Sequence, residues 1–116
     1  MTDEANSRLL VLWASGEKET ALNMVLMYTT NSKLHGWWDE VVLLVWGAAS
    51  RLAAEDPDVQ ARIVAARQAG VRVIACLACA KNMGVVERLQ QQGIEVFFTG
   101  QFLSGWLKSG DKVLSI

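Results

Sequence analysis

The stretch Val71–Gly84, VRVIACLACAKNMG, begins as an apolar strand and ends in what resembles the first turn of a helix. Both cysteines of the chain, Cys76 and Cys79, lie where the strand gives way to the helix. A continuous apolar run is typical of a strand that is buried on both faces of a parallel sheet. The stretch therefore indicates an α/β protein, and it raises the question whether the two thiols react or only pack.

The same alternation of apolar strands and helices continues on both sides of this stretch. Helix signals separate the apolar runs, among them Pro57 at a helix start and glycines at helix ends. One glycine, Gly105, lies inside the last expected helix and should weaken it. The expected strands are 7–14, 38–47, 71–76, 94–100 and 111–116, and the expected helices are 17–36, 57–70, 84–93 and 101–110.

Five strands separated by four helices predict one domain, residues 1–116, with a parallel sheet that is covered by helices on both faces. A chain of 116 residues can bury most of its apolar surface without disulfides or a metal ion. Its content of 52% hydrophobic residues is high for a soluble protein. Part of the apolar surface is therefore expected at a subunit interface of a homo-oligomer.

Charge and hydropathy argue against several classes of protein. The formal net charge of −1 supplies no basic field for nucleic acid or anionic lipid. The acidic start MTDEANS does not have the composition of a signal peptide. The longest apolar run, VVLLVWGAA, is far shorter than the roughly 20 residues that span a bilayer. We therefore expect a cytoplasmic protein with free thiols and with no nucleic-acid or membrane partner.

The two cysteines fall at the edge of the sheet where function is expected. In parallel α/β folds, ligands bind beyond the carboxyl ends of the strands. Cys76 ends the third expected strand, and Cys79 follows in the loop or first helical turn. The other residues expected at this edge are Ser15 and Gly16 after the first strand, Trp46 and Gly47 after the second, Asn82 after the cysteines, and Thr99 and Gly100 after the fourth. Ser15, Gly16, Trp46 and Gly47 are expected to line a pocket for the thiol, with backbone amides between Cys79 and Asn82 stabilising it.

A cysteine at a helix start can be reactive because amide groups and the helix dipole lower the pKa of its thiol. Lys81 is close enough in sequence to add positive potential. The pair also has the C-x-x-C spacing of dithiol redox motifs, but no proline lies between the cysteines and Cys76 belongs to the strand. The opposing interpretation is that the thiols are small buried apolar groups. A zinc site needs about four ligands, so two cysteines and the distant His35 predict neither a metal nor a cofactor.

Five tryptophans are many for a chain of this length. Trp13 and Trp46 end strands on the Cys76 side, where they either shield a thiolate or pack in the core, and packing is favoured. Trp37 and Trp38 precede a strand at the opposite end of the sheet and suggest a subunit contact instead.

Several runs together resemble the DsrE/DsrF/YchN-like family: VIACLACAKNMGV at 73–85, QQGIEVFFTG at 91–100, FLSGWLKSGDKVLSI at 102–116, and two earlier segments that begin VLWASGEKET and VVLLVWGAAS. The resemblance covers nearly the whole chain. It implies a three-layer α/β/α fold with a five-stranded, mostly parallel sheet, and assembly into dimers, trimers or hexamers. It also implies that the cysteine matching Cys76 receives a persulfide from a sulfur donor protein and passes it to an acceptor protein.

Three functions follow as alternatives from the residues and the resemblance together. The first is a sulfur carrier or sulfurtransferase-like protein that holds sulfane sulfur on Cys76. The second is a dithiol redox protein in which Cys76 and Cys79 cycle to a disulfide. The third is an oligomeric module without catalysis that binds a small ligand or a partner. The resemblance does not assign Cys79 to the relay, because the relay subunits carry only the first cysteine.

Overall fold

The computed structural model describes residues 7–116. The start of the chain, whose composition argued against a signal peptide, lies outside the described residues except for Ser7. The strands form one sheet in the order β4-β3-β2-β1-β5, and every neighbouring pair is parallel. The strands are β1 (Arg8–Trp13), β2 (Glu40–Val45), β3 (Arg72–Cys76), β4 (Glu95–Phe97) and β5 (Lys112–Ser115). The predicted α/β fold with a five-stranded parallel sheet is therefore confirmed.

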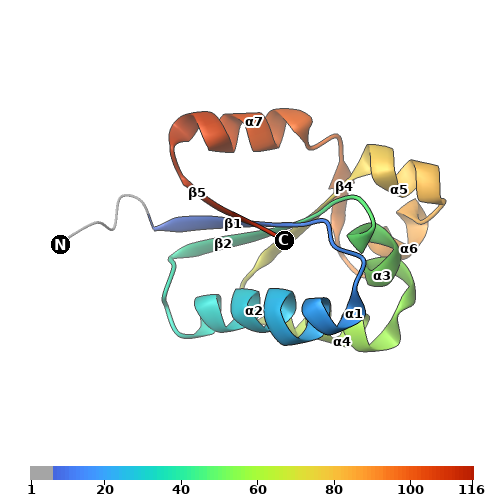
Figure 1. Ribbon diagram of the computed structural model, residues 1–116, viewed down its shortest axis with the longest axis horizontal. Helices are drawn as coiled ribbons and strands as arrows, with labels where there is room; N and C mark the ends of the chain where they lie inside the picture. The colour runs from blue at the N-terminus through green and yellow to red at the C-terminus, as the bar shows by residue number, and fades with distance from the viewer. Residues whose placement is uncertain (1–6) are drawn as a thin grey trace.

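Helical segments connect the strands and cover the two faces of the sheet unequally (Figure 1). The connection after β1 is one helical run, as expected for residues 17–36. Its middle part is π-helical. The connection after β4 is the single helix α7, which forms through Gly105. The helical segments are α1 (Lys18–Thr20), η2 (Ala21–Val25), α2 (Leu26–Leu34), α3 (Ala49–Glu55), α4 (Pro57–Gln68), α5 (Leu77–Met83), α6 (Val86–Gln91) and α7 (Gly100–Ser109).

Two separate apolar clusters hold the layers together. The larger cluster packs helices α2 to α6 on one face and includes Trp13, Ile63 and Leu89, all of which are fully buried. The smaller cluster packs α7 on the opposite face and includes Leu44, Ile74 and Trp106. The connection from β3 to β4 therefore belongs to one face of the sheet, whereas the connection from β4 to β5 belongs to the other.

The structure departs from the expected elements in three places. Helix α3 was not expected, yet its alanines at 49, 53 and 54 are buried, so a small-residue face packs closely against the neighbouring elements. The sequence predicted only a first helical turn after the third strand, but α5 begins directly after Cys76 and continues to Met83. Gly84 follows it with a φ of 70°, which suits the left-handed end of a helix. Strand β4 ends at Phe97, three residues before the expected bound, because Thr99 already occupies the N-cap position of α7.

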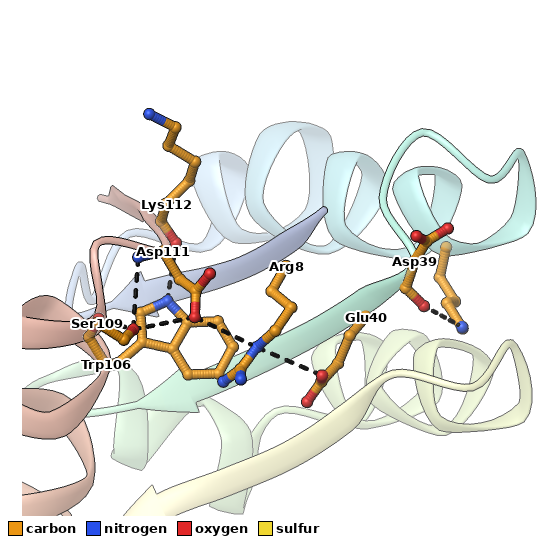
Figure 2. A network of polar contacts seen from close by, with 8 residues as sticks. Arg8, Asp39, Glu40, Trp106, Ser109, Asp111 and Lys112 are labelled. Carbon is orange, nitrogen blue, oxygen red and sulfur yellow. Dashed lines mark hydrogen bonds and ion pairs between the residues drawn. The ribbon is translucent and has the colours of Figure 1, made fainter. Parts of the chain in front are cut away.

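A polar network fixes the end of α7 to the start of β1 (Figure 2), whereas Cys76 lies at the opposite, carboxyl end of the parallel strands. The Arg8 guanidinium lies 4.0 Å from the centre of the Trp106 ring. Its Nε lies 3.4 Å from Glu40 Oε1 and 3.5 Å from Asp111 Oδ2. The Trp106 indole N–H donates to the carbonyl of Lys112 over 3.0 Å. The Trp106 side chain of α7 is thus held in two ways, by the contact of its ring with the Arg8 cation and by the hydrogen bond of its N–H group.

Several large apolar side chains remain on the surface of the described residues. Phe98 is 65% exposed beside the start of α7, and Leu107 is 57% exposed on the same helix. Trp37, which the sequence placed at a subunit contact, is 55% exposed and stacks on His35. These positions suit an interface, and the homo-oligomer stays a prediction. Within residues 7–116, none of the helices combines the length and the apolar character that crossing a bilayer requires.

Two glycines allow a paired test of the backbone. Gly105 lies inside α7 in open space, so Gly105→Ala should raise the free energy of unfolding by about 0.5–1 kcal/mol. Gly47 has a φ of 58°, so Gly47→Ala should lower that free energy by roughly 1–2 kcal/mol. Urea unfolding of both variants checks the opposite signs, and a destabilised Gly105→Ala protein would contradict the account of α7.

Candidate functional site

Cys76 is the last residue of β3, and its thiol faces the α7 side of the sheet. Ile74, two residues earlier in the strand, belongs to the α7-side cluster, and strand side chains alternate between faces. Cys76 pairs with Phe97 in β4. On the other side, the pairing of Val45 with Ala75 places Trp46 beside Cys76, and Trp46 also packs in the α7-side cluster. Two aromatic residues are therefore the sheet neighbours of Cys76, a residue that is only 3% exposed.

The position of Cys76 follows from the way the chain crosses the sheet. Helix α5, which leaves the end of β3, packs on one face, whereas α7, which leaves the end of the neighbouring β4, packs on the other. In open parallel sheets, ligands bind where the connections from neighbouring strands leave toward opposite faces. Cys76 and Thr99 lie at this point, one at the start of each helix.

Polar groups from both helix starts surround the sulfur. Burial raises the pKa of the Cys76 thiol, because a thiolate loses hydration in the interior. The Thr99 hydroxyl and the backbone N–H groups of Cys79, Ala78 and Thr99 act in the opposite direction, because each stabilises the thiolate. Their combined effect prevails, and the pKa of Cys76 lies below its usual value.

These groups act on the ionised sulfur more than on the neutral thiol. Cys76 occupies the N-cap position of α5 but forms no side-chain capping hydrogen bond of ordinary geometry within the described residues. A neutral thiol is a weak acceptor, whereas a thiolate carries a full charge. The groups that lower the pKa are all dipoles. Lys81, which the sequence suggested as a source of positive potential, is exposed and is not among them.

Cys79 and Asn82 both lie on α5, in the turns that follow Cys76. Cys79 is partly exposed and, like Cys76, is a free thiol. Its backbone N–H is one of the groups that stabilise the Cys76 thiolate, so the two cysteines lie within one helical turn. Asn82 is exposed. Within residues 7–116, no three His, Cys, Asp or Glu side chains are grouped so that they could hold a metal ion.

The residues expected to line one pocket around the thiol lie in different surroundings. Ser15 Oγ accepts a hydrogen bond from the Glu17 N–H over 3.3 Å and so stabilises the turn before α1. Trp46 lies beside Cys76, as expected, and Gly47 provides a left-handed turn after β2. Trp13 is fully buried in the cluster on the opposite face, so it packs in the core and does not shield the thiol.

A surface cavity of about 420 Å³ lies at the carboxyl ends of β1 and β2. Of the expected pocket residues it includes Gly16, and neither cysteine lines it. The lining consists of Gly16, Ala48, Arg51, Leu52, Glu55, Asp56, Pro57 and Met83. The thiol and this cavity are therefore separate features of the same edge.

Thr99 is the site residue whose role sequence reasoning missed. It was placed at the end of a strand, among the residues of the carboxyl edge, without a contact to the cysteines. Threonine before a glycine-led helix is a familiar N-cap signal. That signal places the start of α7, but it does not reveal which thiol lies beside it.

Comparison with known proteins gives these features a family context. The model of the DsrE/DsrF-like family matches residues 10–116 of the chain. No curated protein matches the chain.

Three solved structures illustrate the similarity of this chain to known proteins. A conserved protein of unknown function, BT1422 from Bacteroides thetaiotaomicron, is 40% identical, and the match covers 100% of both chains with a TM-score of 0.94. A protein of unknown function, MTH1491 from Methanobacterium thermoautotrophicum, is 14% identical over 94% of this chain and 98% of its own, with a TM-score of 0.74. The ychN protein from E. coli is 18% identical over 96% of this chain and 99% of its own, with a TM-score of 0.65. The last two matches show a shared fold, and the family model spans almost the whole chain. The chain therefore belongs to the DsrE/DsrF-like family.

Proposed function

We propose that this protein is a persulfide carrier, in which Cys76 accepts sulfane sulfur and passes it to the thiol of a partner protein. Membership of the DsrE/DsrF-like family suggests a role related to sulfur relay. The observation that carries the proposal is the thiol at the starts of two helices, where a hydroxyl and three N–H groups lower its pKa. A thiolate is the form of cysteine that attacks sulfur.

The transfer is an exchange between sulfur atoms without net oxidation. The Cys76 thiolate attacks the outer sulfur of a donor persulfide, R–S–SH. The S–S bond of the donor breaks, and the donor leaves as the thiolate RS⁻ with the bonding electron pair, while the proton stays on the outer sulfur of Cys76–S–SH. An acceptor thiolate then attacks that outer sulfur, and Cys76 leaves as a thiolate.

The surroundings of Cys76 suit the storage of a persulfide on this residue as well as the attack on the donor. With Trp46 and Phe97 on either side and 3% of the residue exposed, water and unrelated thiols reach the sulfur poorly. The same groups that stabilise the thiolate also make Cys76 a good leaving group when the acceptor attacks, since a thiol of lower pKa leaves faster.

Intact-mass spectrometry after incubation with glutathione persulfide tests the proposal. The wild-type protein should gain one sulfur atom, Cys79→Ser should gain the same, and Cys76→Ser should gain none. Cys79→Ser is a matched control because it removes the other thiol of the same helical turn. Sulfur gained by Cys76→Ser, or absent from both the wild type and Cys79→Ser, would refute the carrier role of Cys76.

A second candidate function uses both thiols, and the position of Cys79 in the same turn favours it. After loading, the Cys79 thiolate can attack Sγ of Cys76, which forms the disulfide and releases the outer sulfur as HS⁻. The dithiol is then oxidised and the sulfane sulfur is reduced to sulfide. Sulfide released by the wild type and not by Cys79→Ser supports this step, whereas a stable persulfide on both supports the carrier alone.

A further inference from the structure

The hydroxyl of Thr99 is an unusual buried group. Thr99 is 0% exposed, and within residues 7–116 its Oγ1 has no hydrogen-bond partner of ordinary geometry. Buried hydroxyl groups are nearly always paired, because an unpaired one loses its hydration without compensation. An unpaired group of this kind calls for an explanation in terms of a ligand, an ion or a reactive neighbour.

The backbone places Thr99 next to Cys76 at the end of the sheet. Phe97 pairs with Cys76 in the sheet, and Thr99 follows two residues later, where β4 ends. The Thr99 carbonyl accepts the Leu103 N–H over 2.9 Å, which fixes the residue at the first turn of α7. Threonine at an N-cap ordinarily uses its hydroxyl to accept from the helix, but here no such side-chain bond forms within the described residues. The hydroxyl is left free to donate, and it lies close enough to stabilise charge on the Cys76 sulfur.

We propose that Thr99 is a positioning residue for Cys76, whose hydroxyl and backbone N–H donate together to the sulfur where β4 gives way to α7. While the Cys76 thiol is protonated, the Thr99 hydroxyl has no hydrogen-bond partner among the described residues. When the thiol ionises, the thiolate becomes the acceptor for this hydroxyl. The purpose of this arrangement rests on the proposed carrier function. Its physical effect does not, because the ionisation of a thiol can be measured without any sulfur transfer.

Other buried hydroxyl groups show that an unpaired oxygen alone does not make a site. Thr29, Ser32 and Ser50 are also 0% exposed, and their hydroxyls have no partner among the residues that the structure describes, yet none of them acts on the Cys76 thiol. Thr29 lies on α2, which packs on the opposite face of the sheet from α7. It therefore offers a matched control, since the same substitution can be made there at the same burial.

The experiment titrates the thiolate absorbance of Cys76 against pH in a Cys79→Ser background, so that one thiol is observed. Thr99→Val keeps the shape of the side chain and removes the donor. Below the midpoint it should lower the thiolate fraction about tenfold, the usual effect of losing a hydrogen bond to a charged group. Thr99→Ser should keep the wild-type midpoint, and Thr29→Val should leave it unchanged. Circular dichroism at each pH verifies that every variant is folded.

An unchanged midpoint in folded Thr99→Val overturns the proposal, and so does a raised midpoint in Thr29→Val. Either result would show that the Thr99 hydroxyl does not specifically set the titration midpoint of Cys76. If Thr99→Val does not fold, Thr99→Ala and Thr99→Ser decide, because alanine must raise the midpoint and serine must not. The mass experiment keeps the two ideas apart. A wild type that takes up no sulfur while Thr99→Val shifts the titration refutes the carrier role and leaves the role of Thr99 standing.

Discussion

Trp106→Ala should lower the free energy of unfolding by about 3–5 kcal/mol, the usual cost of removing a large aromatic side chain from a core. Trp106 is the one buried residue of α7 and the largest of the buried residues in the cluster on that face of the sheet. Its ring also meets the Arg8 guanidinium, and its N–H donates to the Lys112 carbonyl. A loss of this size is a large fraction of the 5–15 kcal/mol that ordinarily stabilises a domain.

Urea unfolding of three variants separates the contributions. Trp106→Phe keeps most of the apolar area and loses the indole N–H, so its cost should be well below that of Trp106→Ala. Leu107→Ala changes the next residue of the same helix, which is 57% exposed, and should stay within about 0.5 kcal/mol of the wild type. Equal losses in Trp106→Ala and Leu107→Ala would show that burial against the sheet does not hold α7.

The anchoring of α7 also concerns the thiol, because the helix begins at Thr99 and is held at its other end by Trp106. A helix that loses its anchor no longer holds Thr99 firmly beside Cys76. Partly destabilised but folded Trp106 variants should therefore show a higher pKa for Cys76 than the wild type, and thiolate absorbance measures it. An unchanged titration would indicate that β4 alone positions Thr99.

The central strands could be predicted from the sequence because their composition reflects their surroundings. Val41 to Val45 of β2 are all buried, as helices cover both faces of a parallel sheet, and the result is an uninterrupted apolar run. The short helices α3 and α5 were harder to predict. Each has seven residues, and the buried positions hold alanine or serine, which give a weaker apolar periodicity than leucine or isoleucine would.

The site could be predicted only in part, because it depends on register as well as on strand ends. The location of Cys76 at a carboxyl edge followed from its own segment. The neighbours of Cys76 could not be predicted in the same way. Trp13 pairs with Val45, so Trp46 lies on the opposite face of the sheet from Trp13, although both were expected at the end of a strand. A shift of one residue exchanges the faces, and the sequence contains no measure of that shift. The contact with Thr99 likewise depends on α7 crossing the other face of the sheet.

The stability of the wild-type protein should rise with pH relative to Cys76→Ser in the alkaline range. The pKa of Cys76 in the folded protein lies below its value in the unfolded chain. Between these two values the unfolded chain binds more protons than the folded protein, so the free energy of unfolding increases with pH. The contribution is complete above the unfolded-state pKa and is lost as the pH falls through the folded-state pKa.

Urea unfolding of both proteins in reducing buffer, at a series of pH values from neutral upward, measures this difference. The slope relative to Cys76→Ser can reach about 1.4 kcal/mol per pH unit, the value for one proton bound only by the unfolded chain. Cys79→Ser should follow the wild type, because it keeps the thiol and the backbone N–H groups that act on it. Parallel stability curves for the wild type and Cys76→Ser would mean that burial cancels the stabilising hydrogen bonds. The sulfur would then be a buried neutral thiol, and the sheet edge would need another residue to perform sulfur chemistry.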